Sequence, residues 1–201
     1  MKETFTLSET FDKDLDKKSF AKAKKVYCNS IRENDFSILE DKNLVTLIKT
    51  IKRQPDIIGP YIDLTPFEVL NRIGSDLVLL AGAEKLFNNE VPSIIPLTIK
   101  LNMGNKAGED ITIRTEDHII YGEAFNAAPS FCKTKMRQSI DKIFEGFDKG
   151  KFTEKQAVVF YNADVESEIR DYKNQKEIKH SDITIHKIAC DYEKVVDFNL
   201  K

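Results

Sequence analysis

Apolar residues recur at intervals of three and four along residues 67–87, which is the spacing that buries one face of an α-helix. Between residues 77 and 83 the segment is apolar almost all round, so we expect it to lie deep in the core. Thr65 and Pro66 precede it in the order of an N-cap and a first-turn proline. The pattern predicts a long buried helix that begins at residue 66.

Alternating and continuous apolar runs predict three strands after this helix. The run at 93–101 predicts the first strand, and residues 110–114 predict the second, with Asp110 at its start. A third strand is expected at 119–125. Because only the short turn around Glu116-Asp117 separates the last two strands, we expect them to form a hairpin.

A second helix and a fourth strand complete the central stretch. Pro129 opens an amphipathic helix whose apolar residues follow helical spacing until Gly146 or Gly150 ends it. The apolar run at 156–161 predicts a short strand inside a sheet that is covered on both faces. The predicted fold class is therefore α/β with a mixed sheet, in the order helix, strand, strand, strand, helix, strand over residues 66–162.

The flanking segments carry weaker patterns. Residues 13–53 are mostly helical in pattern, a proline and glycine region at 54–60 interrupts them, and a charged helix near 164–177 and a strand near 182–190 follow the centre. A chain of 201 residues without repeats or linkers fits one domain. We therefore expect a single domain over 1–201, made of a helical flank at 1–60, the core at 66–162 and an extension at 163–201.

The composition narrows the class of protein. With 41% hydrophobic and 32% charged residues and no long apolar stretch, the chain is typical of water-soluble globular proteins. No apolar run of signal-peptide length stands near the N-terminus, so we expect a cytoplasmic location. A net charge of −2 argues against a protein that coats nucleic acid indiscriminately, but it is compatible with a local basic cleft. The densest basic cluster predicts a solvated helix face, with a phosphate-binding face as the alternative; its members are Lys17, Lys18, Lys22, Lys24 and Lys25.

The cysteines and histidines indicate neither a disulfide framework nor a zinc centre. Three residues of each kind are present, far apart and without the spacing of metal ligands. We interpret them as small core or surface thiols and as ordinary loop or strand histidines. They are Cys28, Cys132, Cys190, His118, His180 and His186.

Two acidic residues occupy particular places in the predicted hairpin. Asp110 begins the second strand, and Glu123 follows 13 residues later among apolar residues of the third. A carboxylate usually takes such a place only if something offsets its burial, although an ordinary pair of turn and strand acids is the alternative. Together with the order of elements, this placement resembles the core of the PD-(D/E)xK, or restriction-endonuclease-like, nucleases. The resemblance covers about half of the chain.

The resemblance implies a metal site with Mg²⁺, or Mn²⁺ in its place. Converging carboxylates bind hard divalent cations through oxygen, and Asp110 and Glu123 are the expected ligands. The family often adds an acid from the preceding helix, where Asp76 and Glu84 are candidates. For each of these two, a carboxylate exposed at the helix edge is the alternative.

The chain departs from the family at Phe125. Two residues after the acid of the third strand the family has a lysine, and phenylalanine can neither donate a proton nor stabilise phosphate charge. A relocated lysine, a metal mechanism without lysine and a lost activity are the three alternatives. Lys133 and Lys135 are the nearest candidates for a relocated catalytic lysine, with Lys100 behind them, and Gln138 resembles a polar helix residue near the active site of some members.

The predicted function is a Mg²⁺-dependent endonuclease that hydrolyses DNA, of the type II restriction kind. Cutting both strands of double-stranded DNA would need two copies of so small a chain, so a homodimer is expected, with the flanks supplying dimer contacts and base recognition. One alternative is a catalytically inactive protein of the same fold that binds nucleic acid, which Phe125 favours. Another is an α/β binding or immunity protein without a nucleic-acid role, which the mildly acidic charge suits.

Overall fold

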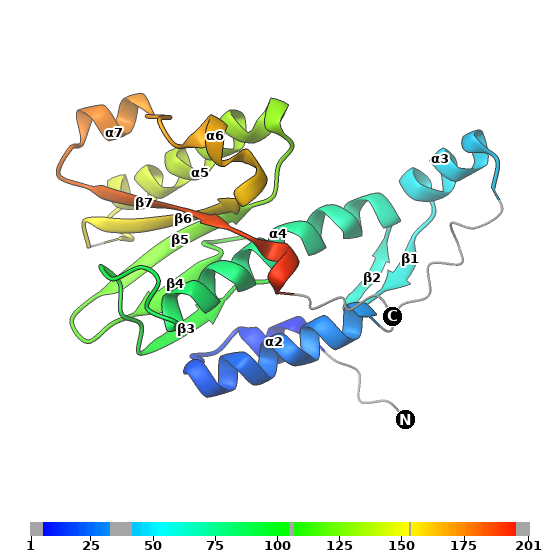
Figure 1. The fold of residues 1–201 in the computed structure, drawn as a ribbon, viewed down its shortest axis with the longest axis horizontal. Helices are drawn as coiled ribbons and strands as arrows, with labels where there is room; N and C mark the ends of the chain where they lie inside the picture. The colour runs from blue at the N-terminus through cyan, green and yellow to red at the C-terminus, as the bar shows by residue number, and fades with distance from the viewer. Residues whose placement is uncertain (1–5, 33–41, 105–106, 153, 196–201) are drawn as a thin grey trace.

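The computed structural model describes residues 6–32, 42–104, 107–152 and 154–195, and its centre is a five-stranded mixed sheet (Figure 1). The strands are β3 (Thr98–Leu101), β4 (Ile111–Arg114), β5 (Ile119–Phe125), β6 (Gln156–Asn162) and β7 (Thr184–Cys190). They lie in the order β3-β4-β5-β6-β7. β4 is antiparallel to both β3 and β5, whereas β6 runs parallel to β5 and β7.

Helices cover both faces of this sheet (Figure 1). One face packs against α4 (Pro66–Phe87) and α2 (Lys17–Arg32), and the other packs against α5 (Pro129–Asp148) and the short α6 (Glu166–Ile169). α3 (Leu44–Arg53) and a hairpin of β1 (Asp56–Ile58) and β2 (Tyr61–Leu64) project beyond the sheet, at the right of Figure 1. The remaining elements are α1 (Leu7–Phe11), α7 (Gln175–Lys179) and the 3-10 turns η2 (Ala163–Val165) and η3 (Tyr192–Lys194).

The predicted α/β class and the predicted order of elements over residues 66–162 are confirmed, because α4, β3, β4, β5, α5 and β6 follow one another there. α4 begins where the sequence indicates. The Thr65 side chain accepts the Glu68 backbone N–H at 3.4 Å, and the Glu68 carboxylate accepts the Thr65 backbone N–H at 2.9 Å. This capping box satisfies two backbone donors that the first turn leaves unpaired.

β6 is buried on both faces, as its continuous apolar run predicts. Val158 and Phe160 belong to the core on the α4 side, while Ala157, Val159 and Tyr161 belong to the core on the α5 side. Side chains alternate across a strand, so a strand in the middle of two helical layers needs apolar residues at every position.

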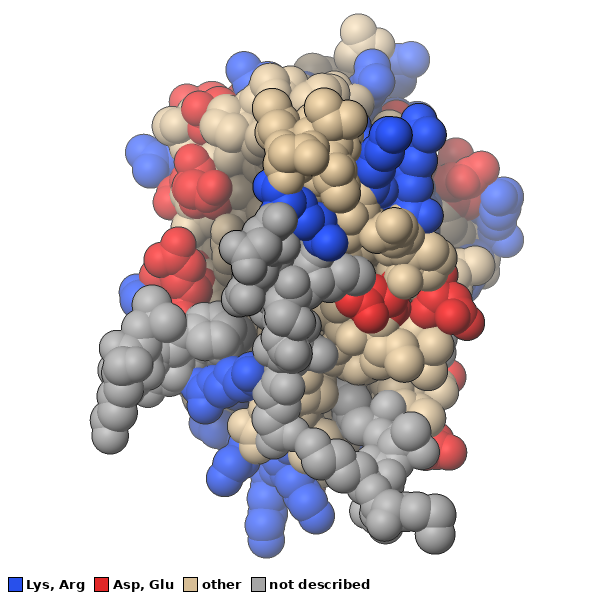
Figure 2. Space-filling view, turned by 90° about the vertical axis from the view of Figure 1, so that its right-hand side faces the viewer, with Lys and Arg blue, Asp and Glu red and all other residues tan. Residues whose placement is uncertain are grey.

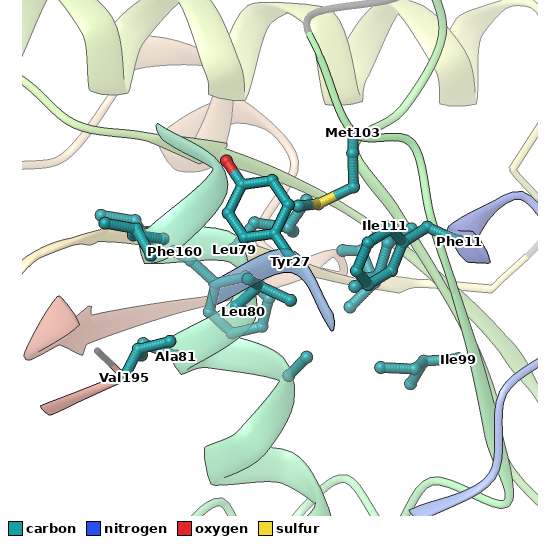
Figure 3. Packing of buried hydrophobic residues seen from close by; sticks show 14 of the residues in the cluster. Phe11, Tyr27, Leu79, Leu80, Ala81, Ile99, Met103, Ile111, Phe160 and Val195 are labelled. Atoms are coloured by element: carbon teal, nitrogen blue, oxygen red, sulfur yellow. The ribbon is translucent and has the colours of Figure 1, made fainter. Parts of the chain in front are cut away.

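The core on the α4 side also includes the N-terminal flank. Figure 3 shows Tyr27 of α2 among Leu80, Met103 and Phe11. All four side chains are almost entirely buried. The helical flank thus covers one side of the core through α2.

Three predicted elements differ from the structure. The first strand is shorter than 93–101 and begins at Thr98, since Pro96 has no backbone N–H to donate to a sheet. The interrupting region at 54–60 forms part of the β1–β2 hairpin, whose turn contains Gly59 with φ 58°. The single helix near 164–177 is wrong: Asn174 caps α7 by accepting the Lys176 backbone N–H at 3.0 Å, and an asparagine stabilises a helix start better than a helix interior.

None of the helices in the described part of the chain has the length and apolar character needed to cross a membrane.

We predict that Gly82→Ala destabilises the protein, although alanine is favoured over glycine in most helices by about 1 kcal/mol. A Cβ at Gly82 would overlap the ring of Phe160, which is fully buried between the two layers of helices. Such overpacking costs roughly 1–3 kcal/mol, so we expect a lower free energy of unfolding in urea.

Asn71→Ala is the matched control, because Asn71 is exposed on the same helix and its replacement tests helix propensity alone. It is expected to leave the free energy of unfolding unchanged or slightly higher. A Gly82→Ala variant as stable as wild type would contradict the close packing of α4 on β6.

Candidate functional site

The two acids of the predicted hairpin lie side by side. β4 and β5 pair with Ile111 opposite Gly122, and the Asp110 backbone N–H donates to the Gly122 carbonyl at 3.0 Å, so the next position of the ladder sets Asp110 against Glu123. Gly122 permits this arrangement, because a Cβ there would stand 2.7 Å from the Val158 carbonyl oxygen on β6. The register that the sequence left open therefore brings the two carboxylates together.

Among the described residues, each carboxylate has one hydrogen-bond partner. Asp110 accepts the Ala124 backbone N–H at 2.8 Å. Glu123 faces the α5 side of the sheet, where Lys142 donates to its Oε2 at 2.6 Å. The Glu123 side chain is only 9% exposed, whereas that of Lys142 is 45% exposed. The buried acid is thus paired with a lysine that reaches in from the surface.

Burial controls the protonation of this pair. Burial raises the pKa of Glu123 to about 8, repulsion from Asp110 adds to the rise, and Lys142 opposes it. Burial also raises the pKa of Asp110, while the Ala124 N–H and Lys142 act in the opposite direction. Near neutral pH the two carboxyl groups together hold a proton, which a bound divalent cation would displace.

A cavity of about 500 Å³ opens beside Asp110. Its wall comes from α4, from the loop before β4, from the end of β5 and from α5. Among the described residues, Glu123 is not part of this wall. The lining residues are Glu68, Asn71, Arg72, Ser75, Asp76, Leu79, Asn102, Asp110, Ala124, Phe125, Asn126 and Lys135.

The structure separates the predicted lysines. Lys135 lines the cavity together with Asp110. Lys133 is exposed on α5 and is not among the lining residues, and Lys100 forms an ion pair with Asp12 at 2.7 Å. Gln138 is exposed and does not line the cavity either, so Lys135 is the predicted lysine that the fold brings to Asp110.

The two predicted acids of α4 have different surroundings. Asp76 is buried and lines the cavity, so its alternative as an exposed helix-edge carboxylate is wrong. Glu84 lies two turns away, about 12 Å along the helix axis, where it forms an ion pair with Lys24 of α2 at 2.5 Å. Glu84 therefore joins two helices and is remote from Asp110.

Lys142 is the residue that sequence reasoning missed. A buried carboxylate at Glu123 needs a positively charged partner. The position of Phe125 and the lysines near the start of the following helix were the candidates from the sequence, and Lys142 was not among them. Phe125 packs in the core on the α5 side with Cys132 and Met136. Lys142 lies two turns beyond Lys135 on α5, so the two lysines share one side of the helix. This spacing was the signal in the sequence that could have indicated Lys142 as the partner of Glu123.

The donor set fits a hard cation with few protein ligands. Across the described ranges, no group of three or more His, Cys, Asp or Glu side chains is arranged to hold a metal ion. Mg²⁺ commonly uses only one or two carboxylates and completes its shell with water and substrate phosphate, and Asp110 with Glu123 supplies that number. The three cysteines are buried and unpaired with one another, as expected for core thiols.

Comparison with known proteins adds no relative: the chain matches no protein-family model, no curated protein and no solved structure.

We predict that Glu123→Gln becomes more stable relative to wild type as the pH rises. The folded state holds a proton on Glu123 up to about pH 8, whereas the unfolded state releases it near pH 4.5, so wild type loses stability between these values. Glutamine does not titrate and avoids this loss. We expect a relative gain on the order of 2 kcal/mol, or about 4–8 °C in Tm, between pH 5 and pH 8.5.

Thermal unfolding at both pH values measures the effect. Glu145→Gln, which removes an exposed carboxylate from α5, is expected to change Tm equally at the two pH values. A Tm difference between Glu123→Gln and wild type that does not change with pH would mean that Glu123 titrates as an ordinary surface acid.

Proposed function

We propose that this chain is a Mg²⁺-dependent phosphodiesterase that hydrolyses DNA, built on a PD-(D/E)xK-like core. The observation that carries the proposal is the pair of half-buried Asp110 and buried Glu123, side by side where β4 meets β5. Two repelling carboxylates do not usually stand side by side with little water around them unless a cation or a proton relieves them. The order of α4, β3, β4, β5, α5 and β6 around the pair supports the same proposal.

Asp110 and Glu123 would hold the cation, which polarises a phosphate and lowers the pKa of a bound water. Lys142, being half-exposed, can swing away from Glu123 when the cation takes over its role as counter-charge. Lys135, in the cavity wall beside Asp110, is placed to stabilise negative charge on the phosphate, in the role of the lysine that Phe125 replaces. The proposal therefore favours a relocated lysine on α5.

We further propose a homodimer, since two copies would present paired sites to a duplex. The projecting end of the molecule supports this. Leu44 and Val45 of α3 and Ile57 and Ile62 of the hairpin are 61–71% exposed, and apolar residues gathered on a surface commonly mark an interface. Figure 2 looks onto this end, where uncharged residues gather at the top beside lysine and arginine side chains. Sedimentation of the purified chain tests this part.

A specific observation favours a second candidate, a catalytically inactive protein of the same fold that binds nucleic acid. Phe125 is buried in the α5 core, and Lys142 is already paired with Glu123. In such a protein Lys142 would be a permanent structural counter-charge. The two candidates differ in one outcome: the first cleaves DNA when Mg²⁺ is present, and the second binds DNA without cleaving it.

We predict that purified protein nicks or cuts plasmid DNA in the presence of Mg²⁺ and that a chelator abolishes the reaction. Asp110→Asn and Glu123→Gln are each expected to lower the rate by about a hundredfold or more, because each removes a ligand charge with little change in shape. Gel assays of plasmid conversion measure the rate, and circular dichroism confirms that each variant is folded.

Asp182→Asn is the matched control, because Asp182 is an exposed carboxylate paired with Lys155 far from the cavity. It is expected to cut at the wild-type rate. Wild-type rates in Asp110→Asn or Glu123→Gln would remove that residue from the site, and a folded wild type that binds DNA without cutting it would favour the inactive candidate.

The lysines of α5 give a separate prediction. Lys135→Ala is expected to reduce cleavage by roughly a hundredfold, since it removes a charge at the cavity wall, whereas Lys133→Ala is expected to cut nearly as fast as wild type. Single-turnover rates on plasmid measure both. If Lys142→Ala is inactive while Lys135→Ala is active, Lys142 has the catalytic role. If all three variants cut at the wild-type rate, the mechanism works without a lysine.

A further inference from the structure

Both oxygens of the Asp76 carboxylate accept hydrogen bonds within the protein. Its Oδ2 accepts the hydroxyl groups of Tyr27, at 3.0 Å, and Tyr61. Its Oδ1 accepts the backbone N–H of Gly104 at 3.2 Å. The residue is 5% exposed. A cation that displaced any of these three donors would leave a buried donor without its partner, which is costly.

Arg72 holds the same glycine from the other side. One turn before Asp76 on α4, its guanidinium donates to the Gly104 carbonyl at 3.0 Å. Gly104 has φ 84°, a left-handed conformation that glycine adopts without strain. Both backbone polar groups of Gly104 are therefore bound by side chains of one helix.

Asn102, two residues before Gly104, is bonded to the segment that carries Asp110. It donates its backbone N–H to the Asp110 carbonyl at 2.9 Å and its side-chain N–H to the Ala107 carbonyl at 3.1 Å. A shift of Gly104 away from α4 would therefore disturb Asn102 and, through it, the position of Asp110.

We propose that Asp76 is a positioning residue: with Arg72 it clamps Gly104 onto α4 and thereby holds Asp110 beside Glu123, rather than binding the metal itself. The inference rests on the proposed function only where it concerns the effect of Asp76 on DNA cleavage. The clamp itself is a property of the fold.

The two tyrosines make the clamp rigid. Tyr27 comes from α2 and Tyr61 from β2, so Asp76 connects two flanking elements to the loop. Burial and the nearby Asp76 carboxylate raise the pKa of both hydroxyl groups, which keeps them protonated as donors. The position of Asp110 thus depends on the N-terminal flank as well as on the sheet.

Asp76→Asn and Asp76→Ala distinguish positioning from metal binding. The asparagine amide can accept the Gly104 N–H through oxygen and donate its N–H groups to the tyrosine oxygens, but it is a poor ligand for Mg²⁺. Alanine breaks the clamp. We expect Asp76→Asn to cut DNA within about threefold of wild type and Asp76→Ala to lose roughly a hundredfold, as for a misplaced catalytic group.

Amide hydrogen exchange measures the clamp without any reaction. In Asp76→Ala the backbone amides of Gly104 and Ala124 are expected to exchange at least about tenfold faster, because the first donates to Asp76 and the second to Asp110. In Asp76→Asn their protection is expected to remain. Asp182→Ala controls for general loss of a carboxylate, and Arg72→Met tests the carbonyl side of the clamp if Asp76→Ala does not fold.

Two results would overturn the proposal. If Mg²⁺ raises the Tm of wild type but of neither Asp76→Asn nor Asp76→Ala, while the two amides stay protected, Asp76 is a metal ligand. If neither Asp76→Ala nor Arg72→Met changes the exchange of Gly104 and Ala124, the clamp does not hold the loop. If wild type shows no response to Mg²⁺ and no cleavage, the proposed function fails, and the exchange data still decide the clamp.

Discussion

The repulsion between two neighbouring carboxylates constrains the whole centre of this protein. Asp110 and Glu123 lie where β4 meets β5, and Glu123 is buried while Asp110 is half-buried at the cavity. Such a pair persists only if a proton, a lysine or a cation reduces the repulsion. The structure supplies the first two through the raised pKa of Glu123 and through Lys142.

The surrounding architecture serves this arrangement from both sides of the sheet. On the α5 side, Lys142 provides a counter-charge that is tethered to a helix yet free to leave toward solvent. On the α4 side, Asp76 and Arg72 hold Gly104, two residues after Asn102, which is bonded to Asp110. The α5 layer thus supplies a positive charge to the pair, and the α4 layer helps to position Asp110. This division explains why polar residues occur on helices that otherwise bury apolar faces.

Sequence periodicity predicted the central elements because both faces of the sheet are buried, which imposes clear apolar patterns on α4, β5, α5 and β6. Asp110 and Glu123 were predictable as a pair, since each has a distinctive place in its strand. Their register was not, because it depends on the geometry of the turn between β4 and β5, which the apolar pattern of the strands does not encode. Lys142 and the partners of Asp76 were likewise hidden, because they lie 15 or more residues away in the chain.

The burial of charge also explains why a phenylalanine stands at position 125 while a lysine stands at position 135. Phe125 fills the core on the α5 side, where a lysine would bury its charge among Cys132 and Met136. A positively charged side chain can then reach the cavity only from an element that lies outside this core. The first two turns of α5 meet this condition, because Lys135 lines the cavity. Phenylalanine at this position therefore packs α5 on the sheet, and the positive charge beside Asp110 is supplied from the helix.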